Sequence, residues 1–173
     1  MSPHRTSTAP DVADHATERR AHRVRRLALA AFTVLVLLGL TGVLGVRTTT
    51  TTADGSGGTR VRVTYPQVAR PALAVAFEVE VSRPDGFEDQ IEIRIDRSWL
   101  ESFDENGVLP TPAEEGSDGD DVVWTFDPPE GTVFTLALDT RVEPGVQWKR
   151  SGTTTVTVGS ERIDVGHTMW IFP

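Results

Sequence analysis

The stretch "LAVAFEVEV", from Leu73 to Val81, decides the fold class of this chain. Every second side chain in it is apolar and falls on one face, whereas Glu78 and Glu80 fall on the opposite face. Successive side chains of an extended strand point to opposite faces of a sheet, so a period of two is typical of a strand with one buried and one wet face. The stretch therefore predicts a half-buried β-strand.

Six further stretches after Gly58 repeat this alternation, and residues with Gly or Pro separate them at turns. The stretches are "RVRVTY", "IEIRID", "VVWTFD", "TVFTLALDTRV", "TTVTV" and "RIDVGHTMWIFP". Only "SWLESF", Ser98 to Phe103, breaks the rhythm, and Ser98 with Glu101 fits a capping box for one helical turn. We therefore predict an all-β fold, a seven-stranded antiparallel sandwich over 59–173, with a small closed barrel as the alternative.

Two stretches, "RPDGFEDQIEIRID" and "FDPPEGTVFTLALDTRVEPG", join a turn to an alternating strand. In this they resemble bacterial extracytoplasmic immunoglobulin-like domains, including those of cell-surface and adhesion-related proteins. The resemblance implies an immunoglobulin-like sandwich, a place outside the cytoplasm, and a role as a spacer or interaction module. The chain has no cysteine, so it lacks the cysteine pair of antibody-type domains, and no functional residue carries over.

Charge divides the chain into parts that face different surroundings. Residues 1–26 hold six arginines and three acids, whereas 47–173 hold eleven basic and twenty-two acidic side chains. Between them, 27–46 is a run of twenty uncharged residues, which as a helix covers about 30 Å, the thickness of a bilayer's hydrocarbon core. The run predicts a transmembrane helix, and a cleaved signal peptide is the alternative.

The arginines before this run orient the predicted span. They are Arg19, Arg20, Arg23, Arg25 and Arg26. Such residues belong on the cytoplasmic side and also attract lipid headgroups. We therefore expect a single-pass protein of the cell membrane, with 1–26 as a disordered cytoplasmic tail, 47–58 as a flexible Thr/Gly tether, and the sandwich outside.

Composition excludes several kinds of chemistry. Without cysteine there are no thiol nucleophiles, disulfides or thiolate metal sites. The excess of acids argues against nucleic acid as a partner of the sandwich. His167, the single histidine after residue 46, has no G-x-S-x-G elbow and shares the parity of buried neighbours, so we expect a packing histidine and no enzyme.

The acidic stretch "DENGVLPTPAEEGSDGDD" runs from Asp104 to Asp121. Calcium binds six to eight oxygens, commonly from closely spaced carboxylates, but neither end of the stretch completes a calcium motif. The five candidate ligands are Asp104, Glu105, Asp118, Asp120 and Asp121. We expect one solvated loop at the sandwich edge and no cofactor, with calcium as the alternative.

Aromatic side chains supply the candidate binding residues. Trp124 alternates with core positions, whereas Trp170 and Phe172 have the opposite parity to Met169 and Ile171. They form an exposed pair unless the last strand is covered on both faces or bulges at Gly166.

A second aromatic candidate lies in the turn before the strand "TTVTV". Trp148 stands beside Lys149 and Arg150, and Trp and Arg are typical anchors of interfaces. An indole that covers the open end of the sandwich is the alternative. The architecture and the lack of a nucleophile–base pair predict a non-catalytic interaction or accessory module that binds another membrane or envelope protein. A module for calcium or a cell-wall glycan is the alternative function.

Overall fold

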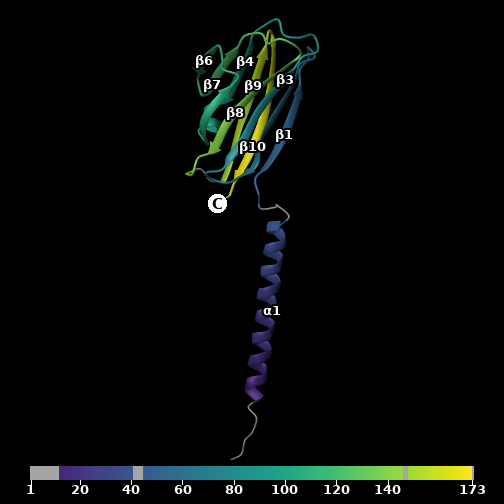
Figure 1. The fold of residues 1–173 in the computed structure, drawn as a ribbon, viewed down its shortest axis with the longest axis vertical. Coiled ribbons are helices and arrows are strands. Elements are labelled where there is room, and N and C mark those ends of the chain that lie inside the picture. The colour runs from purple at the N-terminus through teal and green to yellow at the C-terminus, as the bar shows by residue number, and fades with distance from the viewer. Residues whose placement is uncertain (1–11, 41–44, 146–147, 173) are drawn as a thin grey trace, which may run out of the picture. The chain divides into compact units, whose positions relative to one another are not determined.

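The computed structural model describes residues 12–40, 45–145 and 148–172. It divides into a helical unit up to Gly45 and a β unit from Val46 (Figure 1). The helical unit consists of α1, Val12–Leu40, so the part of the expected disordered tail from Val12 onward is helical.

The predicted transmembrane helix is not found. No helix among the described residues combines the length and apolarity that crossing a membrane needs. The reason lies in the composition of α1: its N-terminal half carries the arginines, and its uncharged part, Leu27 to Leu40, has only fourteen residues. At 1.5 Å per residue that part is about 21 Å long, against about 30 Å for the hydrocarbon core. The rest of the predicted span includes 41–44, which lie outside the described residues.

The described residues of the β unit form ten strands and one short helix. The strands are β1 (Arg47–Asp54), β2 (Arg60–Ala69), β3 (Ala74–Ser82), β4 (Ile91–Asp96), β5 (Phe103–Leu109), β6 (Glu114–Asp118), β7 (Asp121–Phe126), β8 (Val133–Val142), β9 (Trp148–Val158) and β10 (Glu161–Ile171). The helix is α2, Arg97–Leu100, and its N-cap Asp96 makes no side-chain cap bond. The predicted helical turn is therefore present. The predicted capping box is wrong, because Asp96 and not Ser98 is the N-cap residue.

All seven predicted strands are present, as β2 to β4 and β7 to β10, and three more strands arise from segments without alternation. The first is β1, where a flexible tether was expected. It pairs with β2 along its whole length, and Thr50 and Thr51 place their hydroxyls 2.9 Å from Thr64 Oγ1 and 3.2 Å from Tyr65 Oη. Threonine is β-branched and favours strands, so the run joins the sheet once a partner strand is available. The β unit thus begins at Val46 instead of residue 59.

The other two extra strands come from the acidic stretch, which is not one long loop. β5 pairs with β8, where Asp104 lies opposite Arg141, and β6 pairs with β7. All five residues of β6 are exposed. Its carboxylates therefore stay in water while its backbone extends the sheet, which explains how a stretch without buried side chains forms a strand.

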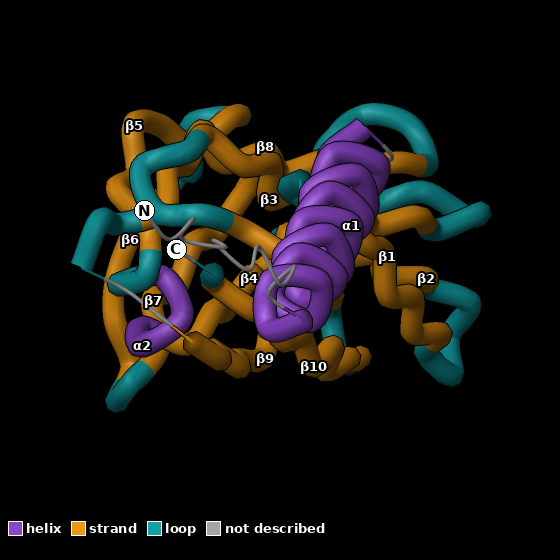
Figure 2. Tube along the Cα trace, turned by 90° about the horizontal axis from the view of Figure 1, so that it is seen from below, coloured by secondary structure: helices purple, strands orange, loops and turns teal. Residues whose placement is uncertain are grey.

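The strands form one continuous path, β5-β8-β3-β2-β10-β9-β4-β7-β6, with β1 on β2. The path folds back where β2 and β10 pair in parallel over two residues, Val68 and Ala69 with Trp170 and Ile171. Figure 2 shows the two resulting layers nearly end-on, with β5, β8 and β3 on one side and β7, β9 and β10 on the other. β5 and β6 do not pair with each other in the described chain, so the sheet is an open sandwich rather than a closed barrel.

One core fills the space between the layers, with side chains from both. Its largest fully buried members are Trp99 from α2 and Trp124 from β7. Trp124 was predicted as core from its alternation. Trp99 was not singled out, because it lies in the turn that breaks the strand rhythm. The predicted sandwich is therefore confirmed, but the described residues form ten strands in place of seven, and the sheet is not wholly antiparallel, because β2 and β10 pair in parallel.

Candidate partner-binding surface

Trp170 and Phe172 lie side by side on the outer face at the end of β10. Pairing between β10 and β9 is regular through Gly166, so no bulge turns these side chains inward. Trp170 is 43% exposed and Phe172 is 44% exposed, whereas Met169 and Ile171 are buried. The two rings are nearly parallel, with centroids 6.4 Å apart and 6° between their planes. The structure thus presents an exposed aromatic pair on a rigid strand.

Lys149 adds a cation to this pair. It lies directly opposite Trp170 on the neighbouring strand β9, and its Nζ is 5.9 Å from the centroid of the Trp170 ring. This distance is within the range of a cation–π contact. By the alternation of β9, Arg150 points to the other face of the strand, opposite the buried Met169, although it is exposed.

Trp148 begins β9 and is 68% exposed. Its φ is +71°, a left-handed conformation that costs a non-glycine residue roughly 1–2 kcal/mol. Of the five predicted binding residues, the structure brings Lys149, Trp170 and Phe172 together. Trp148 and Arg150 lie beside Lys149 on β9.

Sequence reasoning missed one cation at this place, Arg47. Val68 of β2 pairs with Trp170 of β10 on one side and with Arg47 of β1 on the other. The register between β1 and β2 shifts between Arg47 and Thr48. Arg47, Val68, Trp170 and Lys149 therefore form a row across four neighbouring strands. Arg47 is exposed at one end of the row and Lys149 at the other. Arg47 lies in the threonine run, where nothing in the sequence indicates a strand next to Trp170. We call Arg47, Lys149, Trp170 and Phe172 the Trp170 patch.

The cations of the patch differ in their surroundings from four arginines elsewhere on the sandwich. Four arginines pair with carboxylates: Arg60 with Asp54, Arg62 with Glu80, Arg94 with Glu92 and Asp118, and Arg162 with Asp164. Neither Arg47 nor Lys149 has an ion pair with a carboxylate in the described part of the chain. The patch is therefore a positive, aromatic area on an acidic domain.

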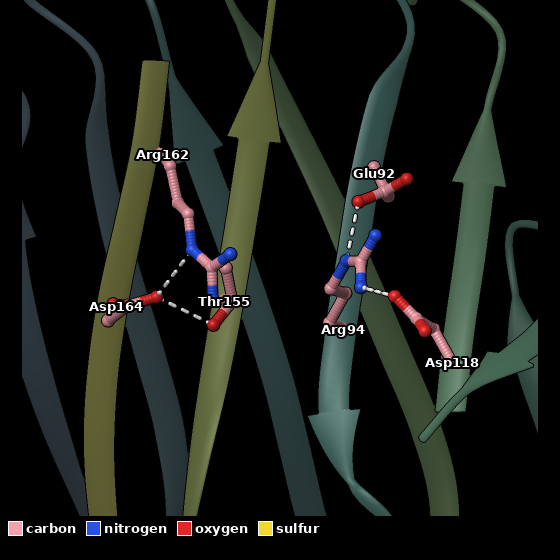
Figure 3. Close-up of polar contacts among 6 residues, drawn as sticks. All are labelled: Glu92, Arg94, Asp118, Thr155, Arg162 and Asp164. Carbon is pink, nitrogen blue, oxygen red and sulfur yellow. Dashed lines mark hydrogen bonds and ion pairs between the residues drawn. The ribbon is translucent and has the colours of Figure 1, made fainter. Parts of the chain in front are cut away.

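The same outer face beyond the patch is polar and internally paired. Figure 3 shows Arg94 between Glu92 and Asp118, with N–O distances of 2.7 Å and 2.5 Å. These carboxylates raise the pKa of Arg94. On β10, Asp164 accepts a hydrogen bond from the Thr155 hydroxyl at 2.6 Å, which lowers the pKa of Asp164. In this area Arg94 and Arg162 are thus paired with carboxylates of the same chain, unlike Lys149.

The five candidate calcium ligands do not form one site. Asp118 and Asp121 lie opposite each other on β6 and β7, and the carboxylate of Asp118 is engaged by Arg94. Asp104 and Glu105 belong to β5, in the other layer. No group of three acidic or histidine side chains within the described ranges could hold a metal ion.

Two of these carboxylates nevertheless have unusual environments. Burial, together with the negative charge of Glu115, raises the pKa of Glu105. Burial and the neighbouring Asp96 raise the pKa of Asp121. The backbone carbonyl of Asp120 accepts a hydrogen bond from the N–H of Arg97 at 2.8 Å. Burial is the larger cause of both shifts, and repulsion from a neighbouring carboxylate adds to it.

His167 is 3% exposed and lies among aromatic rings. Its ring centroid is 4.2 Å from that of Trp99, and its Nε2 is 3.0 Å from Oγ1 of Thr154. Burial lowers the pKa of His167 to about 4. Its position on the inner face of β10 agrees with the expected packing histidine.

Comparison with known proteins identifies remote likenesses only. No protein-family model matches the sequence, and no curated protein matches it. Among solved structures, a type I cohesin from Pseudobacteroides cellulosolvens has a TM-score of 0.41 at 8% identity, over 61% of this chain and 86% of that one. A type I cohesin–dockerin complex from Clostridium thermocellum gives a TM-score of 0.39 at 12% identity, over 61% of this chain and 89% of that one. The major pilin subunit of Bacillus cereus gives 0.41 at 11%, over 73% and 40%.

Proposed function

We propose that the β unit is a non-catalytic module that binds another protein through the Trp170 patch. The observation that carries the proposal is the exposed, parallel pair of Trp170 and Phe172 beside Lys149, on a strand whose other face is buried. Aromatic and cationic side chains that are held on rigid elements are typical anchors of protein interfaces. The expected partner is another membrane or envelope protein, as in the sequence analysis.

The environment of His167 supports a non-catalytic role. A general base must reach a proton of the substrate, but the His167 ring is enclosed by Tyr65, Phe77 and Trp99. With a pKa of about 4, the ring stays neutral at physiological pH and packs as part of the core. The carboxylates of the domain are spread over its strands and edges, several of them in ion pairs with arginines.

Photo-crosslinking in cells that produce the full chain tests the proposal. A benzophenone amino acid at position 170 should give a discrete cross-linked product with another protein. The matched control is position 133, because Val133 is also an exposed apolar residue of a strand but lies on β8. The proposal fails if position 170 gives no product, or if positions 170 and 133 give the same products.

A cell-wall glycan is the second candidate ligand, and the parallel rings of Trp170 and Phe172 favour it, because sugar faces stack on aromatic rings. Sedimentation of the protein with insoluble cell-wall polysaccharide separates the two. A glycan module would sediment with the polysaccharide and lose this on Trp170→Ala, whereas a protein-binding module would remain in the supernatant.

Placement of the β unit outside the cytoplasm stays a prediction. A cysteine introduced at exposed Thr48 would be the only thiol of the chain. Labelling of intact cells by an impermeant thiol reagent would support an extracytoplasmic location, and labelling only after lysis would contradict it.

A further inference from the structure

We infer that the partner presents an acidic segment to the Trp170 patch, with two carboxylates that flank an apolar side chain. The inference rests on the proposed function and specifies the chemistry of its partner. Its basis is the row Arg47, Val68, Trp170 and Lys149, which places a cation at each end and an exposed indole between them.

Charge is the first argument. The sandwich carries twice as many acids as bases, and four of its arginines, Arg60, Arg62, Arg94 and Arg162, are paired with carboxylates of the same chain. The cations of the patch lack such partners among the described residues. A carboxylate brought by another protein would therefore complete ion pairs that the chain itself leaves open. A basic partner would be repelled by Lys149 and Arg47 at this place.

The dimensions of the row are the second argument. Arg47 and Lys149 are three strand spacings apart along the sheet, which is at most about 14 Å at about 4.8 Å per spacing, because the path folds back between β2 and β10. An extended segment advances roughly 3.4 Å per residue, so carboxylates up to about four residues apart match the two cations. A residue midway between them lies over Val68 and Trp170. The expected pattern is therefore acid, spacer, apolar residue, spacer, acid.

The aromatic pair explains why an apolar residue belongs in the middle. Trp170 and Phe172 each keep more than two-fifths of their surface in water, and Lys149 lies over only one of the rings. Covering them with an aliphatic or aromatic side chain removes apolar surface from water and lowers the effective dielectric around both ion pairs. Purely acidic polymers lack this contribution and are expected to bind more weakly.

Selection from a random peptide library, displayed on phage and panned against the full chain, tests the inference. Recovered peptides should carry two acidic residues about four positions apart around an apolar residue. Their affinity should fall at least about tenfold on Lys149→Glu and change little on Arg141→Glu, which makes the same charge change at an exposed position of β8. Rising salt should also weaken binding, because the ion pairs lie at the surface.

Reversal of the charges on both the peptide and the patch provides the strictest test. Peptides in which both acids are replaced by lysine should bind the double variant Arg47→Glu, Lys149→Glu better than they bind the original protein. Recovery of neutral or basic peptides, or equal affinity for the Lys149→Glu variant, would overturn the inference. So would binding of the patch to phosphatidylglycerol vesicles with no peptide recovered, because a lipid surface would then be the partner.

Failure of the inference and failure of the proposed function are distinguishable. If cross-links from position 170 persist in the Lys149→Glu variant at the original yield, the patch binds a protein but does not select it by carboxylates. If those cross-links are absent from the original protein, the proposed function itself fails.

Discussion

The Nε2 atom of His167 lies 3.0 Å from the Oγ1 atom of Thr154, on paired strands inside the core of the sandwich. The other ring nitrogen, Nδ1, is buried without a hydrogen-bond partner in the described structure. A neutral imidazole tolerates this environment, because only one of its nitrogens carries a proton. A charged imidazolium would bury an N–H with no acceptor.

Stability should therefore depend on pH through His167. Its pKa is about 4 in the folded chain and about 6.5 when unfolded, so the unfolded state binds more protons between these values. Stability is full above about pH 6.5 and is lost as pH falls toward 4, by up to roughly 3 kcal/mol. Urea denaturation at several pH values, followed by tryptophan fluorescence, measures this loss.

The neutral variant His167→Gln is the control for this prediction, because it cannot titrate. Its stability should lack the loss assigned to His167 over the same pH range, while carboxylates such as Asp164 contribute equally to both proteins. Direct titration of the His167 ring protons by NMR gives a second measurement. A ring pKa near 6.5 in the folded protein would contradict the prediction.

Gly152 provides the space that Trp99 and His167 occupy. A Cβ atom at this position would lie 2.7 Å from Trp99 Cβ and 2.9 Å from His167 Cε1. We expect Gly152→Ala to lower the free energy of unfolding by about 1–3 kcal/mol, because the core must shift to accept the methyl group. Gly166→Ala is the matched control in β10, since its Cβ meets nothing within 4 Å. Equal stability of the two variants would refute this role of Gly152.

Glu161 holds the turn between β1 and β2 to the start of β10. Its Oε1 accepts the Gly57 N–H at 2.6 Å. The Thr59 hydroxyl and this N–H lower the pKa of Glu161. Glu161→Ala should cost about 1 kcal/mol and speed hydrogen exchange of the β1 amides. Exposed Glu130 is the control, and Glu130→Ala should leave exchange unchanged.

Trp148 should show a conflict between stability and binding. Its φ of +71° suits glycine, so Trp148→Gly is expected to raise stability by up to about 1 kcal/mol. Trp148→Ala keeps the strained backbone and should give no such gain. If Trp148 flanks the binding surface, both variants should weaken partner cross-linking equally, as measured from position 170. A gain in stability from alanine as large as that from glycine would show that backbone strain is not the cause.

The alternation of apolar residues was enough to predict the sandwich, its seven central strands and the burial of Trp124 and His167. Parity also set Trp170 and Phe172 opposite Met169 and Ile171, but it left open whether they face outward, are covered, or turn inward at a bulge at Gly166. Short-range pattern carries this information, because a strand's two faces follow directly from its residue order. The run of uncharged residues, by contrast, was wrongly interpreted as a membrane span, since its described part is too short and continues an arginine-bearing helix.

The sequence by itself determined which side of each central strand is buried, because that depends only on period-two alternation within a few residues. Only the tertiary structure decided that the threonine run and the acidic stretch become β1, β5 and β6. Those segments show no apolar alternation in the sequence and pair with other strands, β1 with β2, β5 with β8 and β6 with β7. It also decided that Arg47 and Lys149, about a hundred residues apart in the chain, stand on either side of Trp170. Register between distant strands is set by the packing of the whole core, so no local pattern predicts which charges it brings together.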